Sequence, residues 1–326
     1  MTNLKRVGVM TSGGDAPGMN AAIRAVVRAS IYYGLEPITI YEGYKGLIEN
    51  QMKQVNARSV ANIINQGGTF LKSARCQEFR TKEGRSKAFE NAKAAHLDGL
   101  IVIGGDGSFM GAMLLEKEYG LPCIGIPGTI DNDIYGTDCT IGYDTALNTV
   151  VEAIDKIRDT ATSHNRLFFI EVMGRDAGFI ALSAGIAAGA EEILIPEQKN
   201  SVEKLLNALQ ASGRAGKTSS IIVVSEGDQC GGVFELAKTV EKSFPDYEAK
   251  VTVLGHIQRG GRPSCFDRVL ASRLGVAAVE ALLKGESGIM VGIRQQKIIN
   301  TPLERAISRP NTIDSHLVKV AEIVTV

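Results

Sequence analysis

Residues 100–108, LIVIGGDGS, decide the fold that we expect for this chain. The first four residues are apolar and mostly β-branched, which is typical of a strand buried on both faces, and glycines with one aspartate follow at once. In open parallel sheets, ligands bind at the carboxyl ends of the strands, where such loops lie. The segment therefore predicts a buried parallel strand that ends at a ligand site.

Similar apolar runs predict further strands at residues 7–10, 37–40, 123–126, 167–172, 193–195, 221–224, 251–254 and 289–291. Helical spacing appears between them at residues 22–33, 86–95, 145–160, 202–211 and 268–284. This alternation predicts an α/β fold with mostly parallel sheets. Because the chain is long and the strands that end in glycine and polar residues form an early and a late group, we expect two domains that face each other across a cleft.

The composition narrows the functional classes. The 36 basic and 36 acidic side chains of the 326 residues cancel, which does not favour a nucleic-acid partner. No apolar run approaches the roughly 20 residues that span a bilayer, so we expect a cytoplasmic protein without membrane contact. The 5 cysteines contain no C-x-x-C pair and the 4 histidines are scattered, so neither a disulfide framework nor a zinc site is predicted.

Two glycine loops follow apolar strands, at residues 12–15 (SGGD) and 104–108 (GGDGS). Backbone N–H groups of such loops, with the helix that follows, can hold an anion. A carboxylate between glycines, here Asp106, can hold Mg²⁺ close to polyphosphate oxygens. Glycines also make tight turns without any ligand, but two such loops in one chain favour phosphate binding.

Residues 127–133, PGTIDND, place a threonine and two carboxylates directly after another buried strand. Asp131 and Asp133 would serve as helix caps or turn formers in a purely structural role. In a catalytic role, one carboxylate would accept the proton of an attacking hydroxyl, while the other orients that hydroxyl or assists the metal. The catalytic role is favoured.

Arginines beside these loops suit bidentate recognition of phosphate: Arg75, Arg166, Arg175 and Arg259. His256 alone would be structural, but its neighbour Arg259 makes a sugar-phosphate contact plausible. Two other nucleotide-binding motifs are present only in incomplete form. The segment ending in GKT at residues 216–218 has Ala211 where a Walker A loop needs glycine, and the glycine at position 111 falls one residue late for a dinucleotide fingerprint.

Several segments in this order and spacing resemble bacterial-type ATP-dependent 6-phosphofructokinase: TSGGDAPGMNAAIR, GGTFLKSAR, IGGDGS, PGTIDND, EVMGRDAG and LGHIQRGG. The resemblance covers about residues 7–292. It implies two Rossmann-like three-layer domains, an ATP-binding one of residues 1–141 and 257–305 and a sugar-phosphate one of residues 142–256 and 306–326. It also implies a homotetramer that transfers the γ-phosphoryl group of MgATP to the 1-hydroxyl of fructose 6-phosphate.

The resemblance further implies residue roles. The expected ATP-site residues are Gly14, Tyr44, Arg75, Cys76, Gly105, Asp106, Gly107, Ser108 and Gly111, with Asp106 helping to hold Mg²⁺. The expected catalytic residues are Asp131 as the base, Thr129, Arg175 and Arg75. The expected sugar-phosphate contacts are Thr129, Asp131, Met173, Gly174, Arg175, Glu226, His256 and Arg259, with Arg166 and Lys250 reaching a neighbouring subunit's site. Lys250 stands where arginine is usual, and Cys76 stands where an aromatic residue is common beside adenine. We therefore expect the affinity for the substrates to differ more than the reaction does.

An effector site for ADP or phosphoenolpyruvate is implied between subunits, at Arg24, Arg28, Arg158, Glu191 and Lys217. Small residues stand where basic side chains are usual: Ala57, Ala215, Thr218 and Ser219. Arg58 and Arg214 are each one residue away, and a one-residue shift redirects a side chain by about 100° on a helix or 180° on a strand. We therefore expect a depleted effector site.

Particular residues disfavour three alternative functions. Pyrophosphate-dependent relatives typically carry Asp where Gly107 stands and Lys where Gly128 stands, so glycine at both positions favours ATP. A sugar-binding protein without chemistry would share the two-domain architecture but would not need Asp106 and Asp131. The late third glycine disfavours an NAD-dependent dehydrogenase.

Overall fold

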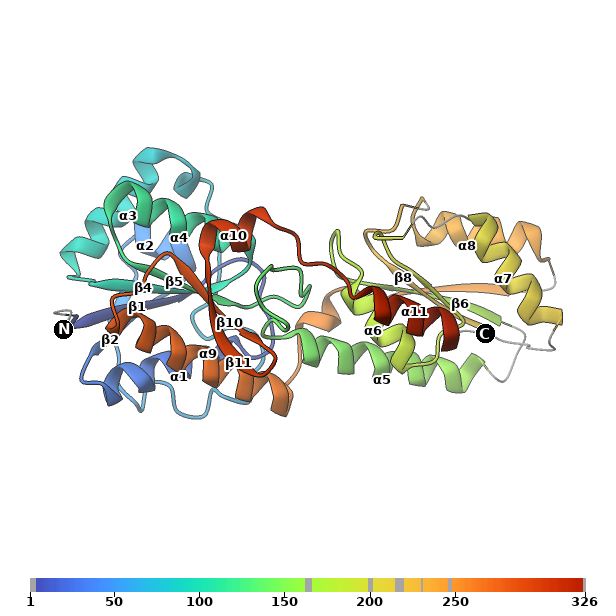
Figure 1. Cartoon of the computed structure of the whole chain (residues 1–326), viewed down its shortest axis with the longest axis horizontal. Helices are drawn as coiled ribbons and strands as arrows, with labels where there is room; N and C mark the ends of the chain where they lie inside the picture. Colours follow the sequence, from blue (N-terminus) through green and yellow to red (C-terminus); the bar gives the residue numbers. More distant parts are fainter. Residues whose placement is uncertain are drawn as a thin grey trace. The chain divides into compact units, whose positions relative to one another are not determined.

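The computed structural model describes residues 4–161, 166–198, 202–214, 220–229, 231–245 and 248–324. The chain divides into two compact units, shown in Figure 1. Unit 1 comprises Met1–Ile130, Ile134–Thr145 and Arg259–Asn311, and unit 2 comprises Asp131–Asp133, Ala146–Gln258 and Thr312–Val326. Each unit therefore contains segments that are far apart in the sequence.

The sheet of unit 1 has 7 strands in the order β11-β10-β5-β4-β1-β2-β3. Their bounds are β1 (Arg6–Thr11), β2 (Glu36–Ile40), β3 (Met52–Gln54), β4 (Gly99–Gly104), β5 (Cys123–Pro127), β10 (Ile289–Arg294) and β11 (Lys297–Pro302). The inner strands pair in parallel, while β3 and β11 pair antiparallel at the two edges. All residues of β4 are buried, because the sheet is covered on both faces.

Helices cover both faces of this sheet (Figure 1). One face carries α1 (Met19–Tyr32) and α9 (Cys265–Leu283), and the other carries α2 (Gly43–Ile48), α3 (Lys82–Ala94), α4 (Asp106–Tyr119) and α10 (Leu303–Ser308). A short 3-10 helix, η1 (Glu78–Arg80), precedes α3. The second face buries one continuous apolar core that includes Leu100, Val102, Phe109 and Leu115. Unit 1 is thus a three-layer α/β unit.

The sheet of unit 2 has 4 parallel strands in the order β7-β8-β6-β9. They are β6 (Arg166–Val172), β7 (Glu192–Leu194), β8 (Ser220–Ser225) and β9 (Glu248–Val253), followed by the 3-10 helix η2 (Gly255–Arg259). In Figure 1, α7 (Val202–Arg214) and α8 (Val233–Ser243) lie on one face, and α5 (Tyr143–Ala161), α6 (Phe179–Ala187) and α11 (Ser315–Val324) lie on the other. Unit 2 has the same three layers.

The predicted fold class is confirmed: both sheets are mostly parallel and helices cover their faces. One predicted strand differs. Residues 251–254 were expected as a strand buried on both faces, but β9 begins at Glu248, lies at the edge of the described sheet and is partly exposed. The antiparallel edge strands β3 and β11 were not predicted.

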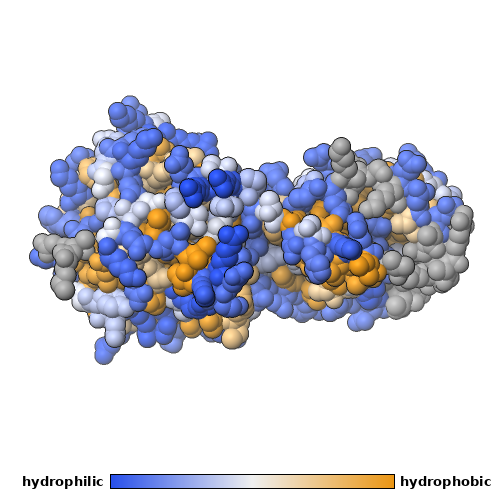
Figure 2. Space-filling view, viewed as in Figure 1, coloured by the Kyte–Doolittle hydropathy of each residue, from blue (hydrophilic) through white to orange (hydrophobic). Residues whose placement is uncertain are grey.

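The surface shown in Figure 2 is a mixture of hydrophilic and hydrophobic residues. More than half of the surface of an ordinary folded protein is apolar, so such a mixture indicates no special partner. Within the described residues, no helix combines the length and the apolar character needed to cross a membrane.

Candidate active site

The two glycine loops of unit 1 are in direct contact at the carboxyl ends of β1 and β4. The backbone N–H of Ser12 donates to the carbonyl oxygen of Ile103 at 3.0 Å. A Cβ added to Gly104 would lie 2.4 Å from the Ser12 carbonyl oxygen, so only glycine allows this approach. The parallel pairing of β1 with β4 thus brings residues 12–15 and 104–108 to one place.

The second loop opens the helix α4, whose first residue is Asp106. Gly105 has φ −99, which any residue adopts, and a Cβ on Gly105 or Gly107 would meet no atom within 4 Å. The fold itself therefore requires glycine at neither position. The open space lies at the amino end of a helix of 14 residues, where free N–H groups and the positive end of the helix dipole favour an anion.

Gly111 is glycine for a different reason. A Cβ there would lie 2.6 Å from Cζ of Tyr44, whose hydroxyl donates to the Ser108 carbonyl oxygen at 2.5 Å. Tyr44 is only 6% exposed and stacks on Phe79, with ring centroids 4.0 Å apart. Burial raises the pKa of Tyr44 well above its usual value, so the hydroxyl remains a donor. Tyr44 and Gly111 therefore support the first turn of α4 from beneath.

Arg259 lies beside the first glycine loop, within unit 1. Its Nη1 donates to the Asp15 carbonyl oxygen at 3.2 Å, and a Cβ on Gly14 would lie 2.7 Å from the same nitrogen. Gly14 thus leaves room for this guanidinium group. Arg75, which is exposed, and Cys76, which is partly buried, lie in the segment between β3 and η1.

The third loop, residues 127–133, leaves β5 next to the second glycine loop. The backbone N–H of Gly128 donates to the Gly104 carbonyl oxygen at 3.0 Å. Thr129 is 8% exposed, and its carbonyl oxygen accepts a hydrogen bond from Thr140 Oγ1 at 2.6 Å. Asp131 follows two residues later and is 3% exposed. A carboxylate so little hydrated suits a base that acts on a bound ligand.

Unit 2 places the predicted sugar-phosphate contacts at the carboxyl ends of β6 and β8. The N–H groups of Gly174 and Arg175 donate to Glu226 Oε1 at 3.2 and 2.7 Å. This carboxylate stabilises Arg175 in the left-handed conformation, with φ 53. Arg175 Nη1 lies 3.7 Å from Asp133 Oδ2, so the group also includes the segment Asp131–Asp133.

Met173 and His256 lie near the same ends of the strands. The N–H of Met173 donates to Oε1 of the buried Gln258 at 3.2 Å. His256 is exposed in η2, two residues before Gln258. The carboxyl ends of the strands of unit 2 therefore gather the residues around Arg175.

Arg166 lies at the amino end of β6, and Lys250 is the third residue of β9, where it pairs with Phe168. Arg166 begins β6, a strand of 7 residues whose far end precedes Met173; at about 3.3 Å per residue, the two ends are roughly 20 Å apart. Arg166 Nε donates to Glu248 Oε2 at 2.8 Å, and Lys250 Nζ donates to the other oxygen of Glu248. These two cations are therefore not part of the group around Arg175.

The predicted effector residues fall in both units. Arg24 and Arg28 lie on α1 in unit 1, where burial and the charge of Arg28 lower the pKa of Arg24. In unit 2, Arg158 Nη2 donates to the carbonyl oxygens of Ala188 and Gly189, both at 2.7 Å, and Arg158 Nη1 lies 3.7 Å from Glu191 Oε1. Lys217, Ala215, Thr218 and Ser219 lie outside the described residues.

The donor set around α4 fits a divalent cation that arrives with a polyphosphate. Among the described residues, no group of three or more His, Cys, Asp or Glu side chains forms a protein-only metal site. Asp106 is exposed at the first residue of α4, beside the open space at Gly105 and Gly107. Mg²⁺ is usually held by one or two carboxylates together with substrate phosphates and water.

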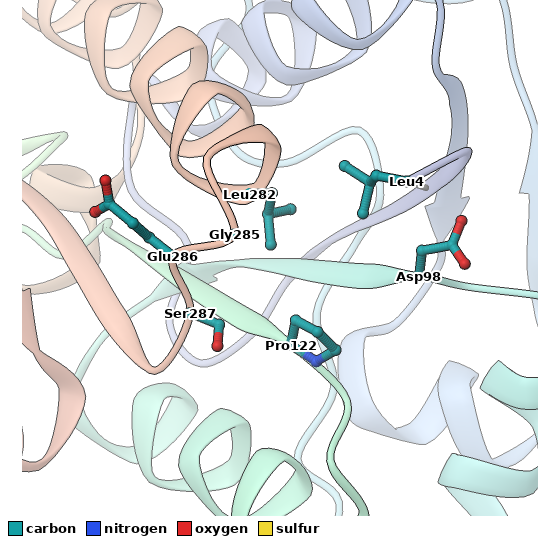
Figure 3. Close-up of a pocket in the computed structure, with 7 residues that line it drawn as sticks. All are labelled: Leu4, Asp98, Pro122, Leu282, Gly285, Glu286 and Ser287. Atoms are coloured by element: carbon teal, nitrogen blue, oxygen red, sulfur yellow. The ribbon is translucent and has the colours of Figure 1, made fainter. Parts of the chain in front are cut away.

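A cavity of about 310 Å³ lies at the other end of the unit 1 sheet (Figure 3). Leu4, Asp98, Pro122 and Ser287 line it, just before β1, β4, β5 and β10. Asp98 Oδ2 accepts the backbone N–H groups of Lys5 and Arg6 at 2.7 and 2.8 Å. This carboxylate therefore secures the start of β1, and the cavity is separate from the glycine loops.

Sequence reasoning missed two buried polar residues that support these loops. Asp267 is 0% exposed and accepts hydrogen bonds from the N–H groups of Gly142 and Thr145, both at 2.8 Å. It thereby caps the amino end of α5, and burial raises its pKa while the Thr145 and Gly142 donors oppose this rise. The second is Asn20, on α1. A polar residue on an otherwise apolar helix face was the available signal for both.

Comparisons with known proteins agree with the resemblance. A family model described as phosphofructokinase matches residues 6–282. The ATP-dependent 6-phosphofructokinase 1 of Thermus thermophilus is 56% identical over 320 residues, 98% of this chain and 99% of its own. A solved phosphofructokinase from Saccharomyces cerevisiae has a TM-score of 0.89 and 39% identity over 93% of this chain, which spans only 45% of the yeast chain.

A solved pyrophosphate-dependent phosphofructokinase from Marinobacter aquaeolei has a TM-score of 0.84 but only 25% identity, over 96% of this chain and 86% of its own. Enzymes named for different phosphoryl donors thus share this architecture. The family model covers most of the chain, and the Thermus relative matches almost all of it at more than half identity. The chain therefore belongs to the phosphofructokinase family.

Proposed function

We propose that this chain transfers the γ-phosphoryl group of MgATP to the 1-hydroxyl of fructose 6-phosphate, giving fructose 1,6-bisphosphate and ADP. The observation that carries the proposal is the open space at Gly105 and Gly107, at the amino end of α4. The protein's own packing gives no reason for glycine there, whereas a polyphosphate lying on the helix terminus does.

In this reaction the protein acts by position and electrostatics. Phosphoryl transfer passes through a loose transition state whose charge is spread over the equatorial oxygens. The N–H groups of the loops at residues 12–15 and 104–108 and the guanidinium group of Arg75 would stabilise that charge. No covalent intermediate on the protein is needed.

Asp106, at the first residue of α4, would hold Mg²⁺ together with the phosphate oxygens. When bound, the cation neutralises charge on the β- and γ-phosphates. Gly105 and Gly107 keep the space beside this carboxylate open for the nucleotide.

Asp131 would act as the base that accepts the proton of the sugar 1-hydroxyl. Its burial limits hydration, and Asp133, two residues on, pairs with Arg175. The sugar phosphate would be bound and oriented by Arg175 together with Thr129, Met173, Gly174, Glu226 and His256. Arg259 would contribute a further phosphate contact. Orientation of this kind converts a bimolecular reaction into an effectively unimolecular one.

Arg166 and Lys250 would serve a second subunit. Both pair with Glu248, which begins β9 beside the amino end of β6, and the family resemblance places both cations at a neighbouring subunit's site. This placement supports an oligomer, and the family resemblance supports a homotetramer. Their shared partner Glu248 would hold both cations until a phosphate group draws them away.

ATP is preferred over pyrophosphate as the donor. Gly107 and Gly128 are small and uncharged, and the relative at 56% identity is named for ATP. Aspartate at position 107 would place a negative charge at the amino end of α4, where nucleotide phosphates are proposed to lie.

The test is direct identification of the product. Protein, fructose 6-phosphate, ATP and Mg²⁺ are incubated and followed by ³¹P NMR, with one sample lacking Mg²⁺ and one lacking the sugar. We expect a new phosphomonoester at C1 of fructose and an equal amount of ADP in the complete sample alone. Release of inorganic phosphate from ATP without a bisphosphate product would refute the proposed function.

A further inference from the structure

Asn20 is a buried polar side chain on α1, a helix whose other inward residues are almost all apolar. It is 1% exposed, and it makes three hydrogen bonds to the backbone of one distant loop. Nδ2 donates to the carbonyl oxygens of Gln66 and Gly67 at 3.1 and 3.2 Å. Oδ1 accepts the N–H of Phe70 at 2.6 Å.

Thr11, the last residue of β1, holds the next part of the same loop. Its hydroxyl donates to the Lys72 carbonyl oxygen at 2.8 Å and therefore accepts the hydroxyl of Thr69, also at 2.8 Å. Thr11 is 0% exposed and directly precedes the first glycine loop. Residues 66–72 are thus fixed by two side chains of the nucleotide-binding unit.

One residue of this loop has an unfavourable backbone conformation. Lys72 has φ 59, in the left-handed region that disfavours a side chain. A Cβ on Gly67 would lie 2.2 Å from the carbonyl oxygen of Gly261, two residues after Arg259. The hydrogen bonds from Asn20 and Thr11 therefore hold a strained loop against the segment that carries Arg259.

Arg75 follows this loop closely. It comes three residues after Lys72, and the other end of its segment is fixed by Phe79, which stacks on Tyr44. Arg75 itself is exposed, and these two anchors fix the chain on either side of it. A displaced anchor would move the guanidinium group while leaving the sheet intact.

We propose that Asn20 and Thr11 are positioning residues, which set the loop at residues 66–72 so that Arg75 reaches the phosphates of the nucleotide. This inference rests on the proposed function, because it concerns the nucleotide site of that reaction. It assigns to Asn20 and Thr11 an effect on catalysis that is exerted through Arg75 and not through the stability of α1 or β1.

The experiment is a double-mutant cycle between the anchor and the arginine. Asn20→Ala removes all three hydrogen bonds, Asn20→Asp keeps the acceptor for Phe70 but loses both donors, and Thr11→Val is close to isosteric. Each is made alone and with Arg75→Ala. The readouts are kcat, KM for MgATP, KM for fructose 6-phosphate and the melting temperature, with rates measured well below that temperature.

The matched control is Ser30→Ala, on the same helix. Ser30 is buried, and its hydroxyl has no hydrogen-bond partner among the described residues. Removing this hydroxyl should leave every kinetic constant unchanged. A loss of activity in Ser30→Ala equal to that in Asn20→Ala would show a general effect of altering α1 and would overturn the proposal.

We expect Asn20→Ala to lower kcat/KM for MgATP by about tenfold or more with Arg75 present, and by less than about threefold with Arg75→Ala, because interacting residues are not additive. KM for fructose 6-phosphate should change less. Equal losses in both backgrounds would overturn the proposal. Should Asn20→Ala not fold, Thr11→Val and Asn20→Asp are subject to the same criterion.

Calorimetric binding of MgATP separates this inference from the proposed function. A wild-type protein that binds MgATP but does not phosphorylate fructose 6-phosphate would refute the proposed function, and the cycle would then be measured on the binding constant. Asn20→Ala should then lower the affinity for MgATP less in the Arg75→Ala background than in the wild-type background. Equal losses in the two backgrounds would reject Asn20 as a positioning residue. A wild-type protein that does not bind MgATP overturns both.

Discussion

At the scale of single residues, a substitution at Gly107 tests the nucleotide site. A Cβ there meets no atom within 4 Å, and aspartate is favourable in the first turn of a helix. Gly107→Asp should therefore change the free energy of unfolding by less than about 1 kcal/mol. The ATP-dependent rate should fall by roughly 100-fold or more, because the added negative charge repels the phosphates of the nucleotide at close range.

Chemical denaturation and ATP-dependent rates of Gly107→Asp are measured together. Gly111→Ala is the control with the opposite pattern, since its Cβ would lie 2.6 Å from the ring of Tyr44 and should destabilise the protein. A Gly107→Asp variant with full ATP-dependent activity would remove the nucleotide from the amino end of α4.

Asp131 tests the proton transfer. Asp131→Asn keeps the size of the side chain but cannot accept the proton, so turnover should fall by about 10² to 10⁴. Binding of MgATP and of fructose 6-phosphate should stay within a few fold, because the lost interaction matters only as the proton leaves. Calorimetry and steady-state rates check this together. A variant that keeps more than about a tenth of the wild-type turnover would rule out Asp131 as the base.

At this scale the sequence grouped residues without showing the structural reason for each. It identified Gly105, Gly107 and Gly111 as one set, yet two of them face open space and the third accommodates Tyr44. The polar Asn20 on an apolar helix face was a signal of a buried polar contact, but its partners at residues 66–70 are distant in the sequence and only the folded chain brings them together. Local patterns carry no information about such contacts.

At the scale of elements, a half-buried carboxylate on α4 connects this helix to the segment that precedes β10. Glu116 Oε1 accepts the hydroxyl of Ser287 at 2.5 Å. Burial raises the pKa of Glu116 above its usual value, and the Ser287 hydroxyl opposes this rise. The charged form therefore costs the folded state free energy.

A pH dependence follows from the direction of this shift. The stability that Glu116 contributes is fully present below its unfolded pKa of 4.5 and is lost as the pH rises through the higher folded pKa. Glu116→Gln does not titrate, so its stability relative to the wild type should increase between about pH 4 and pH 7. Urea denaturation of both proteins across this range measures the difference. A constant difference would show that Glu116 does not titrate in this way.

Among the strands, the hydrophobic pattern of the sequence predicts the inner ones and misses the edge ones. Strands such as β4 were predicted because both faces are apolar over several residues. The edge strands β3 and β11 were missed because only one neighbour and one partly covered face constrain their residues. For the same reason, the strand predicted at residues 251–254 begins later than β9, which starts at Glu248, and was expected to be more buried than β9 is.

At the scale of the whole molecule, the two groups of strands predicted two α/β units, but the segments that compose each unit come from contacts that the sequence does not show. Regulation also belongs to this scale. Ala57 and Arg58 are both exposed in the turn that follows β3, and Arg158 already bonds to Ala188 and Gly189. We expect an effector site with few free cations.

Each missing charge-assisted phosphate contact removes roughly 1.5 to 3 kcal/mol of effector affinity. Millimolar ADP or phosphoenolpyruvate should therefore shift the half-saturating concentration of fructose 6-phosphate by less than about threefold, since coupling cannot exceed the effector's preference between states. Saturation curves with and without each effector measure the shift. Strong sigmoidicity that micromolar ADP relieves would contradict this expectation.

If the glycine loops of unit 1 form the site of an ATP-dependent phosphofructokinase, the enzyme should use ATP and not pyrophosphate. The most direct measurement compares ATP and pyrophosphate as donors to fructose 6-phosphate, by coupled assay of fructose 1,6-bisphosphate at equal Mg²⁺. Gly105, Gly107 and Gly128 predict rapid turnover with ATP and a rate with pyrophosphate no higher than the enzyme-free blank. Turnover with pyrophosphate that equals or exceeds turnover with ATP would show that ATP is not the preferred donor and would contradict the proposed function.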